Sequence, residues 1–272
     1  MSVTAFLTDS TLCIGCKACE VACKEWNGVS GDGADWSGFS YDNTGALGAS
    51  TWRHVKFVEQ SPVAGLGGNA GEQASWTFSS DVCKHCEKAG CLEACPTGSI
   101  VRTEFGGVFI QPDVCNGCGY CVTSCPFGVV ERNQKDGRAF KCTFCYDRQK
   151  AGLVPACAKA CPTESIKFGE IENLREQATQ RLAELQRRGI DDASIYDSSN
   201  TSVGGTHAMF IVRGDPRSYN LPPSPEVPTV YLKKAWTSSA IAAGLLLAGT
   251  LIAFLSDSDR GKTRSAGSGR SE

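Results

Sequence analysis

The sequence predicts an α+β protein of small cysteine-rich modules, followed by a linker and one apolar helix near the carboxyl end. The 272 residues include 16 cysteines, which fall into four groups of four with none left over. The 41% of hydrophobic residues counts these cysteines, so bulky aliphatic side chains are scarce and cannot fill the interior alone. An uncharged run, Trp236–Leu255, is as long as a membrane-spanning helix. The formal charge of −2 argues against a general nucleic-acid surface.

The spacing within the four cysteine groups is typical of iron–sulfur ligands. Group III has the C-x2-C-x2-C-x3-C-P spacing of bacterial ferredoxins, and the other groups are variants of it. A disulfide scaffold would be expected behind a signal peptide, which the amino terminus MSVTAFLTDS does not resemble. Zinc sites combine separated pairs, often with histidines, of which the chain has three. We therefore predict four [4Fe–4S] clusters. The groups are I, Cys13, Cys16, Cys19 and Cys23; II, Cys83, Cys86, Cys91 and Cys95; III, Cys115, Cys118, Cys121 and Cys125; and IV, Cys142, Cys145, Cys157 and Cys161.

The fourth cysteine of each group is expected to reach a different cluster from the first three. In two-cluster ferredoxins this cysteine ligates the partner cluster. Groups II and III are close in sequence and should form one module, which leaves groups I and IV to pair around it. The predicted ligand sets are cluster A, Cys13, Cys16, Cys19 and Cys161; cluster B, Cys142, Cys145, Cys157 and Cys23; cluster C, Cys83, Cys86, Cys91 and Cys125; and cluster D, Cys115, Cys118, Cys121 and Cys95.

This pairing predicts two ferredoxin-like modules, one inserted in the other. The expected segments are 1–80, the first half of the outer module with a loop insertion; 81–135, the inserted two-cluster module; 136–213, the second half of the outer module with an amphipathic helix; 214–231, a Pro-rich linker; 232–256, a transmembrane helix; and 257–272, a polar tail.

Smaller elements follow from local patterns. Short strands are expected at Gly107–Gln111 and Phe140–Lys141. Residues 27–50 are rich in Gly, Ser, Asp and Asn, which indicates an irregular loop. Residues 171–188 carry an apolar stripe and end at Gly189, which predicts an amphipathic helix that packs on its own domain, with docking of a partner as the alternative.

The apolar run near the carboxyl end predicts a single membrane span. Ala240, Gly244 and Ala248 recur every fourth residue and offer a face on which another membrane helix could pack. Basic residues are more numerous after the span than before it, which favours a cytoplasmic carboxyl tail and a cluster domain on the outer face. Without a signal of its own, such a domain would have to be exported folded with a signal-bearing partner. The basic residues are Lys233 and Lys234 before the span, and Arg260, Lys262, Arg264 and Arg270 after it.

Positive and titratable side chains near the ligands have two interpretations. Lysines beside an anionic cluster would stabilise it and raise its reduction potential, but each could equally be a solvated surface lysine. The three histidines have no partner at catalytic spacing, and a structural or surface role is expected for each. The lysines are Lys17, Lys24, Lys84, Lys88, Lys141 and Lys159, and the histidines are His54, His85 and His207.

The chain resembles the iron–sulfur (beta) subunit of membrane-bound respiratory formate dehydrogenase, one of the four-cluster partners of molybdopterin oxidoreductases. The resemblance covers roughly residues 8–255. Subunits of the nitrate-reductase and dimethyl-sulfoxide-reductase type replace the second group III cysteine, which this chain keeps as Cys118. The motifs that carry the resemblance, besides the terminal span, are CIGCKACEVACKEWN at 13–27, YDN at 41–43, CNGCGYCVTSCPF at 115–127, KCTFCYDR at 141–148 and VGGTH at 203–207.

The resemblance implies an electron-transfer subunit with no catalytic site of its own. A catalytic alpha subunit with a molybdenum or tungsten bis-pterin would oxidise formate, and the four clusters would pass electrons to a membrane cytochrome b gamma subunit and on to quinone. Alternatives remain open at this point. The same subunit could serve a nickel–iron hydrogenase or another molybdopterin oxidoreductase, or the chain could be a polyferredoxin without a fixed partner or a structural zinc protein.

Overall fold

The computed structural model describes residues 2–29, 38, 42, 44–60 and 75–265. The chain divides into two compact units, Met1–Val227 and Pro228–Glu272. The expected loop at 27–50 lies partly outside the described residues. Its described positions after the first helix contain no further helix or strand.

A four-stranded sheet with the order β8-β1-β10-β9 organises the first unit. Strand β1 lies parallel to β10 and antiparallel to β8, while β9 lies antiparallel to β10. Because successive side chains of a strand point to opposite faces, β1 directs Ala5 and Leu7 to one side and Phe6 to the other. The strands are β1 (Thr4–Asp9), β8 (Ile166–Glu170), β9 (Ala193–Tyr196) and β10 (Ala208–Arg213).

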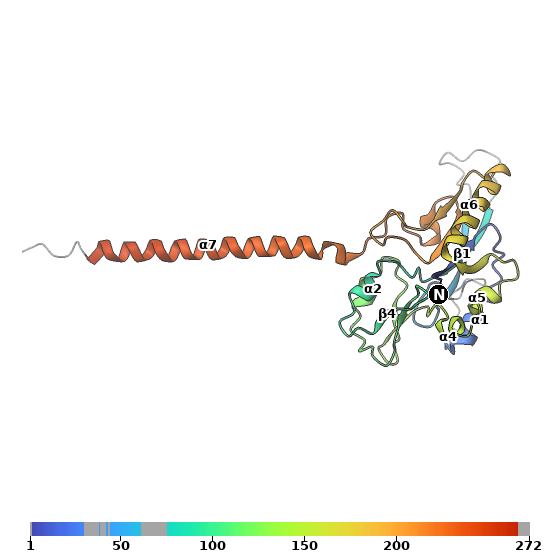
Figure 1. Cartoon of the computed structure of the whole chain (residues 1–272), viewed down its shortest axis with the longest axis horizontal. Coiled ribbons are helices and arrows are strands. Elements are labelled where there is room, and N and C mark those ends of the chain that lie inside the picture. The colour runs from blue at the N-terminus through green and yellow to red at the C-terminus, as the bar shows by residue number, and fades with distance from the viewer. Residues whose placement is uncertain (1, 30–37, 39–41, 43, 61–74, 266–272) are drawn as a thin grey trace, which may run out of the picture. The chain divides into compact units, whose positions relative to one another are not determined.

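One face of this sheet is covered by helix α6 (Ile171–Arg187), beside β1 in Figure 1. Its buried Leu174, Ala178 and Leu185 pack with Ala5 and Leu7 in one apolar cluster. The chain turns after the helix at Gly189, whose φ of +79° suits glycine. The amphipathic helix expected at 171–188 is therefore confirmed, and it packs on its own domain.

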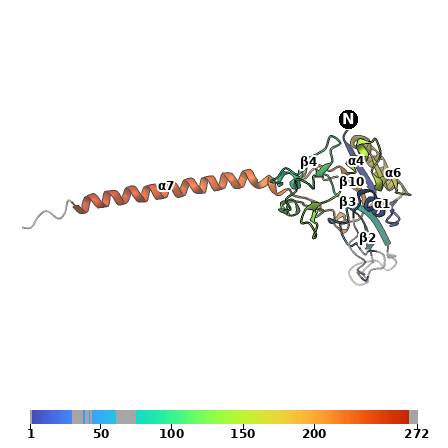
Figure 2. The ribbon, with the colours of Figure 1, turned by 90° about the horizontal axis from the view of Figure 1, so that it is seen from below.

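The other face of the sheet meets the cysteine-bearing segments. Phe6 and Phe210 of the sheet share a core with cysteines of all four groups. An antiparallel hairpin of β2 (Arg53–Gln60) and β3 (Ser75–Val82) also packs here, with β3 beside β10 (Figure 2). This hairpin was not predicted from the sequence.

Short helices and strands hold the cysteine groups. In groups I, II and III, the cysteine-rich loop runs into a helix that carries a later cysteine of the group. In group IV, α4 follows Cys145 and Cys157 lies on the next helix, α5. In Figure 1, α1 and α5 lie side by side, and α2 lies near β4. Strand β4 pairs with β5, and β6 pairs with β7. Strands β5 and β7 confirm the strands expected at Gly107–Gln111 and Phe140–Lys141, to within one residue at each end. The elements are α1 (Ala18–Asn27), α2 (Gly90–Glu93), β4 (Ile100–Arg102), β5 (Val108–Ile110), α3 (Tyr120–Thr123), β6 (Glu131–Arg132), β7 (Ala139–Phe140), α4 (Tyr146–Lys150) and α5 (Ala156–Lys159).

The Pro-rich segment expected as an extended linker packs on the first unit as far as Val227. It forms a short 3-10 helix, η1 (Pro216–Tyr219), and buries Tyr219, Leu221 and Val227. The Tyr219 hydroxyl lies 2.8 Å from the Thr77 hydroxyl of β3. The linker interpretation was wrong for this part. The apolar side chains that lie between its prolines are enough to anchor the segment on the first unit.

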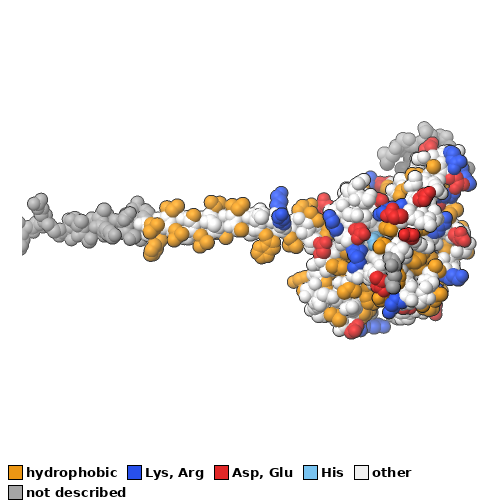
Figure 3. Space-filling view, in the orientation of Figure 1, with side chains coloured by type: hydrophobic (Ala, Val, Ile, Leu, Met, Phe, Trp, Pro, Cys, Tyr) orange, Lys and Arg blue, Asp and Glu red, His pale blue; other side chains and the backbone are white. Residues whose placement is uncertain are grey.

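The second unit begins with the 3-10 helix η2 (Pro228–Tyr231) and continues as helix α7 (Leu232–Ser265). Among the described residues, one segment, Pro228–Leu255, is long and apolar enough to cross a membrane. Its apolar side chains are exposed, and Figure 3 shows them along the helix. The helix continues past the expected end of the span at residue 256.

The packing of α6 makes a testable prediction. Leu174→Ala should lower the free energy of unfolding by about 2–5 kcal/mol, because it leaves a cavity under the helix. Glu176→Ala, at an exposed position of the same helix, should change it by less than about 0.5 kcal/mol. Chemical denaturation of the two variants measures the difference, and equal midpoints would contradict the packing described here.

Candidate metal centres

A cavity at the start of α1 is lined by Cys13, Cys16, Cys19 and Cys161, the four residues of predicted set A. The loop reaches around this cavity with left-handed backbone at Gly15, φ +69°, and Lys17, φ +58°. At Gly15 a Cβ atom would lie 3.1 Å from the Phe78 ring, so both the backbone and the space favour glycine. The loop therefore fits closely against the β2–β3 hairpin.

A second cavity is lined by the four cysteines of predicted set C: two from the group II loop, Cys91 of α2, and Cys125, which follows α3. Helices α2 and α3 pack together, which brings Cys125 across to group II. At Gly90 of α2 a Cβ atom would lie 2.5 Å from the Ser124 carbonyl oxygen. Glycine at this position lets the two helices approach this closely.

The sulfurs of sets B and D are also electrostatic neighbours. The thiol of Cys142 interacts with those of Cys23, Cys145 and Cys157, and also with that of Cys83 in set C. Close packing of α1 against α5 brings Cys23 into this group. In set D, the Cys121 thiol interacts with those of Cys95, Cys115 and Cys118. The structure thus brings together the four members of each predicted set.

The four sets differ in their access to solvent. Every cysteine of set B is buried, whereas sets A and D each include an exposed cysteine, Cys16 and Cys118. Set C has two buried and two partly buried cysteines. Sets A and D therefore lie at the surface of the first unit, and B lies in its interior.

The donor atoms fit an iron–sulfur cube better than a single ion. Across the described residues, no group of three or more His, Cys, Asp or Glu side chains is close enough to hold one metal ion. A zinc ion would need its thiolates about 2.3 Å from the metal. Burial raises the pKa of the Cys19 and Cys23 thiols to about 12, so these thiols are protonated at neutral pH unless a metal binds them.

Three cations are buried beside the cysteines. Lys84 is paired with Asp81, whereas Arg53 and Lys141 have no carboxylate partner in the part of the chain that the structure describes. Of the lysines considered from the sequence, Lys84 and Lys141 are thus buried near ligands. Lys88 and Lys159 are exposed.

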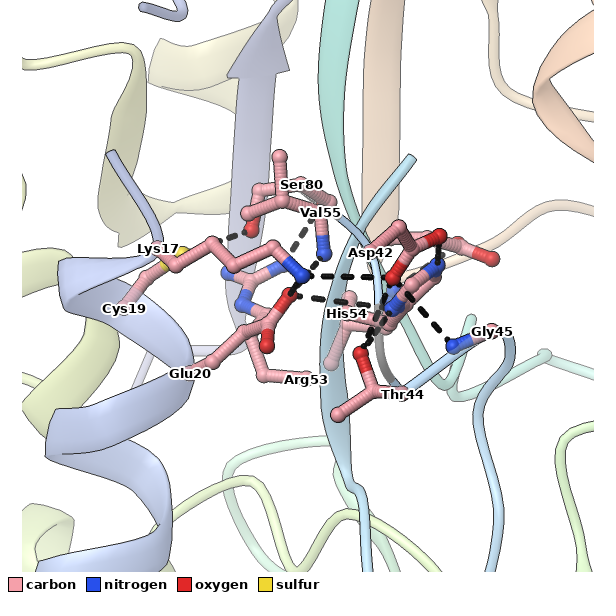
Figure 4. A network of polar contacts seen from close by, with 12 residues as sticks. Lys17, Cys19, Glu20, Asp42, Thr44, Gly45, Arg53, His54, Val55 and Ser80 are labelled. Carbon is pink, nitrogen blue, oxygen red and sulfur yellow. Dashed lines mark hydrogen bonds and ion pairs between the residues drawn. The ribbon is translucent and has the colours of Figure 1, made fainter. Parts of the chain in front are cut away.

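A polar network fastens the set A loop to β2 (Figure 4). The backbone N–H of Val55 donates to buried Glu20 of α1. Lys17 donates to Asp42 at 3.2 Å, and His54 lies 3.6 Å from both Glu20 and Asp42. Burial raises the pKa of Glu20 and lowers that of His54. Asp42, the central residue of the YDN motif, therefore has a structural role beside set A.

The other two histidines are packed against the loop of set C. His85 accepts a hydrogen bond from the Val108 N–H at 3.0 Å and lies against the Phe144 ring. The His207 ring occupies the space beside Gly106, where a Cβ atom would lie 2.2 Å from it. The backbone N–H of His207 donates to the Lys84 carbonyl at 2.9 Å, so the VGGTH motif holds the group II loop. Both histidines are buried, and their contacts suit a structural role.

Arg53 and Ser80 were not predicted as site residues from the sequence. The Ser80 hydroxyl lies 3.1 Å from the Cys19 sulfur. Arg53 donates to the Ser80 carbonyl at 3.1 Å and to the Cys157 sulfur at 3.5 Å. The available signal was an arginine at the start of RHVKFVEQ, a segment whose strand character was not recognised.

Comparisons with known proteins agree with this site. Two models described as 4Fe-4S dicluster domains match residues 12–99 and 74–171. The formate dehydrogenase-O iron-sulfur subunit of Escherichia coli K12 is 42% identical over 229 residues, which is 82% of this chain and 72% of that protein. The formate dehydrogenase iron-sulfur subunit of Haemophilus influenzae is 42% identical over 228 residues, 82% of this chain and 70% of that protein.

The chain belongs to the formate dehydrogenase iron–sulfur subunits. A more distant relative, the B subunit of the anaerobic dimethyl sulfoxide reductase of Escherichia coli K12, is 33% identical over 172 residues, 63% of this chain and 76% of that protein. The two dicluster matches and the sixteen cysteines account for four [4Fe–4S] clusters in this formate dehydrogenase iron–sulfur subunit.

Proposed function

We propose that this subunit relays electrons from formate oxidation, at a molybdenum or tungsten bis-pterin catalytic subunit, to a membrane cytochrome b subunit and quinone. The observation that carries the proposal is the meeting of sixteen cysteines in four sets of four within one unit. A bound [4Fe–4S] cluster takes up and returns one electron. The names of the formate dehydrogenase relatives support formate as the substrate of the complex.

The proposed ligands are the four predicted sets, with the fourth cysteine of each group exchanged. The cavities of sets A and C support this, because each contains one cysteine from a different group. The same exchange supports an inserted module. Groups I and IV meet through the β1–β8 pair and through α1 with α5, and groups II and III lie between them in sequence and meet through α2 and α3.

The order of the sets along the path is proposed to be A, B, C, D. Arg53 contacts both Cys157 of set B and Ser80, the neighbour of Cys19 in set A. Lys141 adjoins Cys142 of set B and is within electrostatic reach of set C.

The exposed cysteines at sets A and D suit contact with partner subunits. Val227, the last residue of this unit, lies against Gly90 of α2, the helix that is followed by Cys95 of set D. We assign set D to the cytochrome and set A to the catalytic subunit.

The apolar segment of α7 is proposed to be a single membrane span. Its length and its exposed apolar side chains support this. The small-residue face at Ala240, Gly244 and Ala248 would pack on a helix of the cytochrome subunit. The excess of basic residues after the span supports a cytoplasmic carboxyl tail and a cluster domain on the outer face.

Metal content tests the cofactor assignment. Protein purified without oxygen should contain about sixteen iron and sixteen sulfide, since four cubes each hold four of both. Chemical analysis and the brown colour of the protein measure this. Folded protein that carries zinc alone would exclude the proposal.

Ligand exchange is tested by two neighbouring cysteines of group III. Cys125→Ala should remove or damage cluster C and leave D intact, because its sulfur lies in the cavity of group II. Cys121→Ala, the matched control, should damage D instead. Electron paramagnetic resonance of the two complexes distinguishes the clusters. Loss of the same cluster in both variants would show that the exchange is wrong.

The role of α7 is tested by deleting residues 232–272, which leaves all sixteen cysteines in place. Formate oxidation with an artificial dye should persist, whereas formate-driven quinone reduction should fall at least tenfold. The reason is that electron tunnelling decays steeply with distance, so loose docking at the cytochrome interrupts the path. Unchanged quinone reduction in membranes would show that α7 is dispensable.

A further inference from the structure

Two positive charges in the interior of the first unit lack a counter-charge on the described chain. Arg53 is 1% exposed and Lys141 is 3% exposed, and neither has a carboxylate within ion-pair distance among the described side chains. Burying an unpaired charge is costly, so a buried cation normally has an anion beside it. Burial without a carboxylate partner therefore points to another anion beside each of these cations.

Arg53 lies between the sulfurs of sets A and B. Its guanidinium donates to the Cys157 sulfur of set B at 3.5 Å and to the Ser80 carbonyl at 3.1 Å. The Ser80 hydroxyl lies 3.1 Å from the Cys19 sulfur of set A. Figure 4 marks this contact with a dashed line. The Phe6 ring lies 4.8 Å from the guanidinium carbon and excludes water. A guanidinium stays charged at every relevant pH, so this charge is permanent.

Lys141 has the equivalent place between sets B and C. Its ammonium donates to the carbonyl of Cys142, a set B residue, at 3.2 Å and to the carbonyl of Val108. Val108 lines the cavity that contains the cysteines of set C. The charge of Lys141 acts on Cys83 and Cys91 of set C as well as on Cys142.

Lys84 is a buried lysine that does have a carboxylate partner. It is fully buried beside set C and lies 5.0 Å from the Phe210 ring, but its ammonium is paired with Asp81. The pair contributes little net charge to the surroundings. The two unpaired cations are thus distinct from the other buried lysine of the unit.

We infer that Arg53 and Lys141 are shared counter-charges of the clusters, Arg53 for A and B and Lys141 for B and C. The inference rests on the proposed ligand sets. A positive charge stabilises the reduced cluster, which is the more negative form, more than the oxidised one, and so raises the reduction potential of both neighbours. Both residues are positioning residues for electron transfer, because they set the energy of the electron on two successive centres without accepting it.

Redox titration of the purified complex, followed by electron paramagnetic resonance, tests this. Arg53→Met and Lys141→Met should each lower the midpoint potentials of two clusters and leave the others unchanged. We expect about a tenfold lower ratio of reduced to oxidised cluster at a fixed potential, or about 59 mV for a one-electron couple. In the double variant three clusters should shift, one of them, cluster B, by the sum of both effects.

The controls separate charge from folding and from the cluster assignment. Lys159→Met removes an exposed charge two residues from both Cys157 and Cys161 and should shift no midpoint. Arg53→Lys keeps the charge and should retain the wild-type potentials. If Arg53→Met does not load iron, loading of Arg53→Lys with unchanged potentials still supports the charge role. Failure of both variants to load overturns it.

Other outcomes also overturn the inference. A shift confined to one cluster, an equal shift of all four, or no shift in a fully loaded variant would show that these cations are not shared between neighbours. Iron and sulfide content of the unmodified complex is measured in the same preparations. A wild-type complex without four cubes contradicts the proposed function, whereas four cubes with unshifted potentials contradict only this inference.

Discussion

The first unit depends on bringing cysteines from distant parts of the chain around common centres. Cys161 reaches the cavity of the group I loop, and Cys125 reaches that of group II. The helices that carry these loops, α2, α3 and α5, have four residues each and are too short to be stable alone. Their stability must come from tertiary packing. The cysteines also belong to the main apolar core, where they replace the aliphatic side chains that the composition lacks.

Much of this organisation could be predicted from the sequence because it is local. The spacing within each cysteine group fixes which sulfurs share a loop, and the apolar stripe of α6 fixes which face of that helix is buried. The membrane candidate is equally local, since length and composition define it. The exchange between groups was a longer-range prediction, and it relied on the known behaviour of two-cluster ferredoxins rather than on any feature of one segment.

The remaining features depend on contacts between segments that are far apart. Arg53 and Cys157 meet because β2 and α5 both pack near α1, which no pattern within RHVKFVEQ reveals. The Pro-rich segment after residue 213 has the composition of a linker, but Tyr219 finds Thr77 on β3 and the segment becomes buried. The role of Asp42 also depends on Lys17 and His54 meeting it in space. Position relative to other segments decides these cases, and sequence patterns do not encode it directly.

The buried charges distinguish sets A, B and C from set D. Burial lowers the pKa of His54, His85 and His207, so at neutral pH these side chains add no positive charge. The charge of Lys84 is offset by Asp81, which leaves Arg53 and Lys141 as the unpaired cations beside sets A, B and C among the described residues. Set D has an exposed cysteine, so water and mobile ions surround it in part. Their screening weakens the effect of any single charge on this set. Fixed charges therefore act on sets A, B and C, whereas the energy of an electron at set D depends on the partner surface that replaces the solvent there.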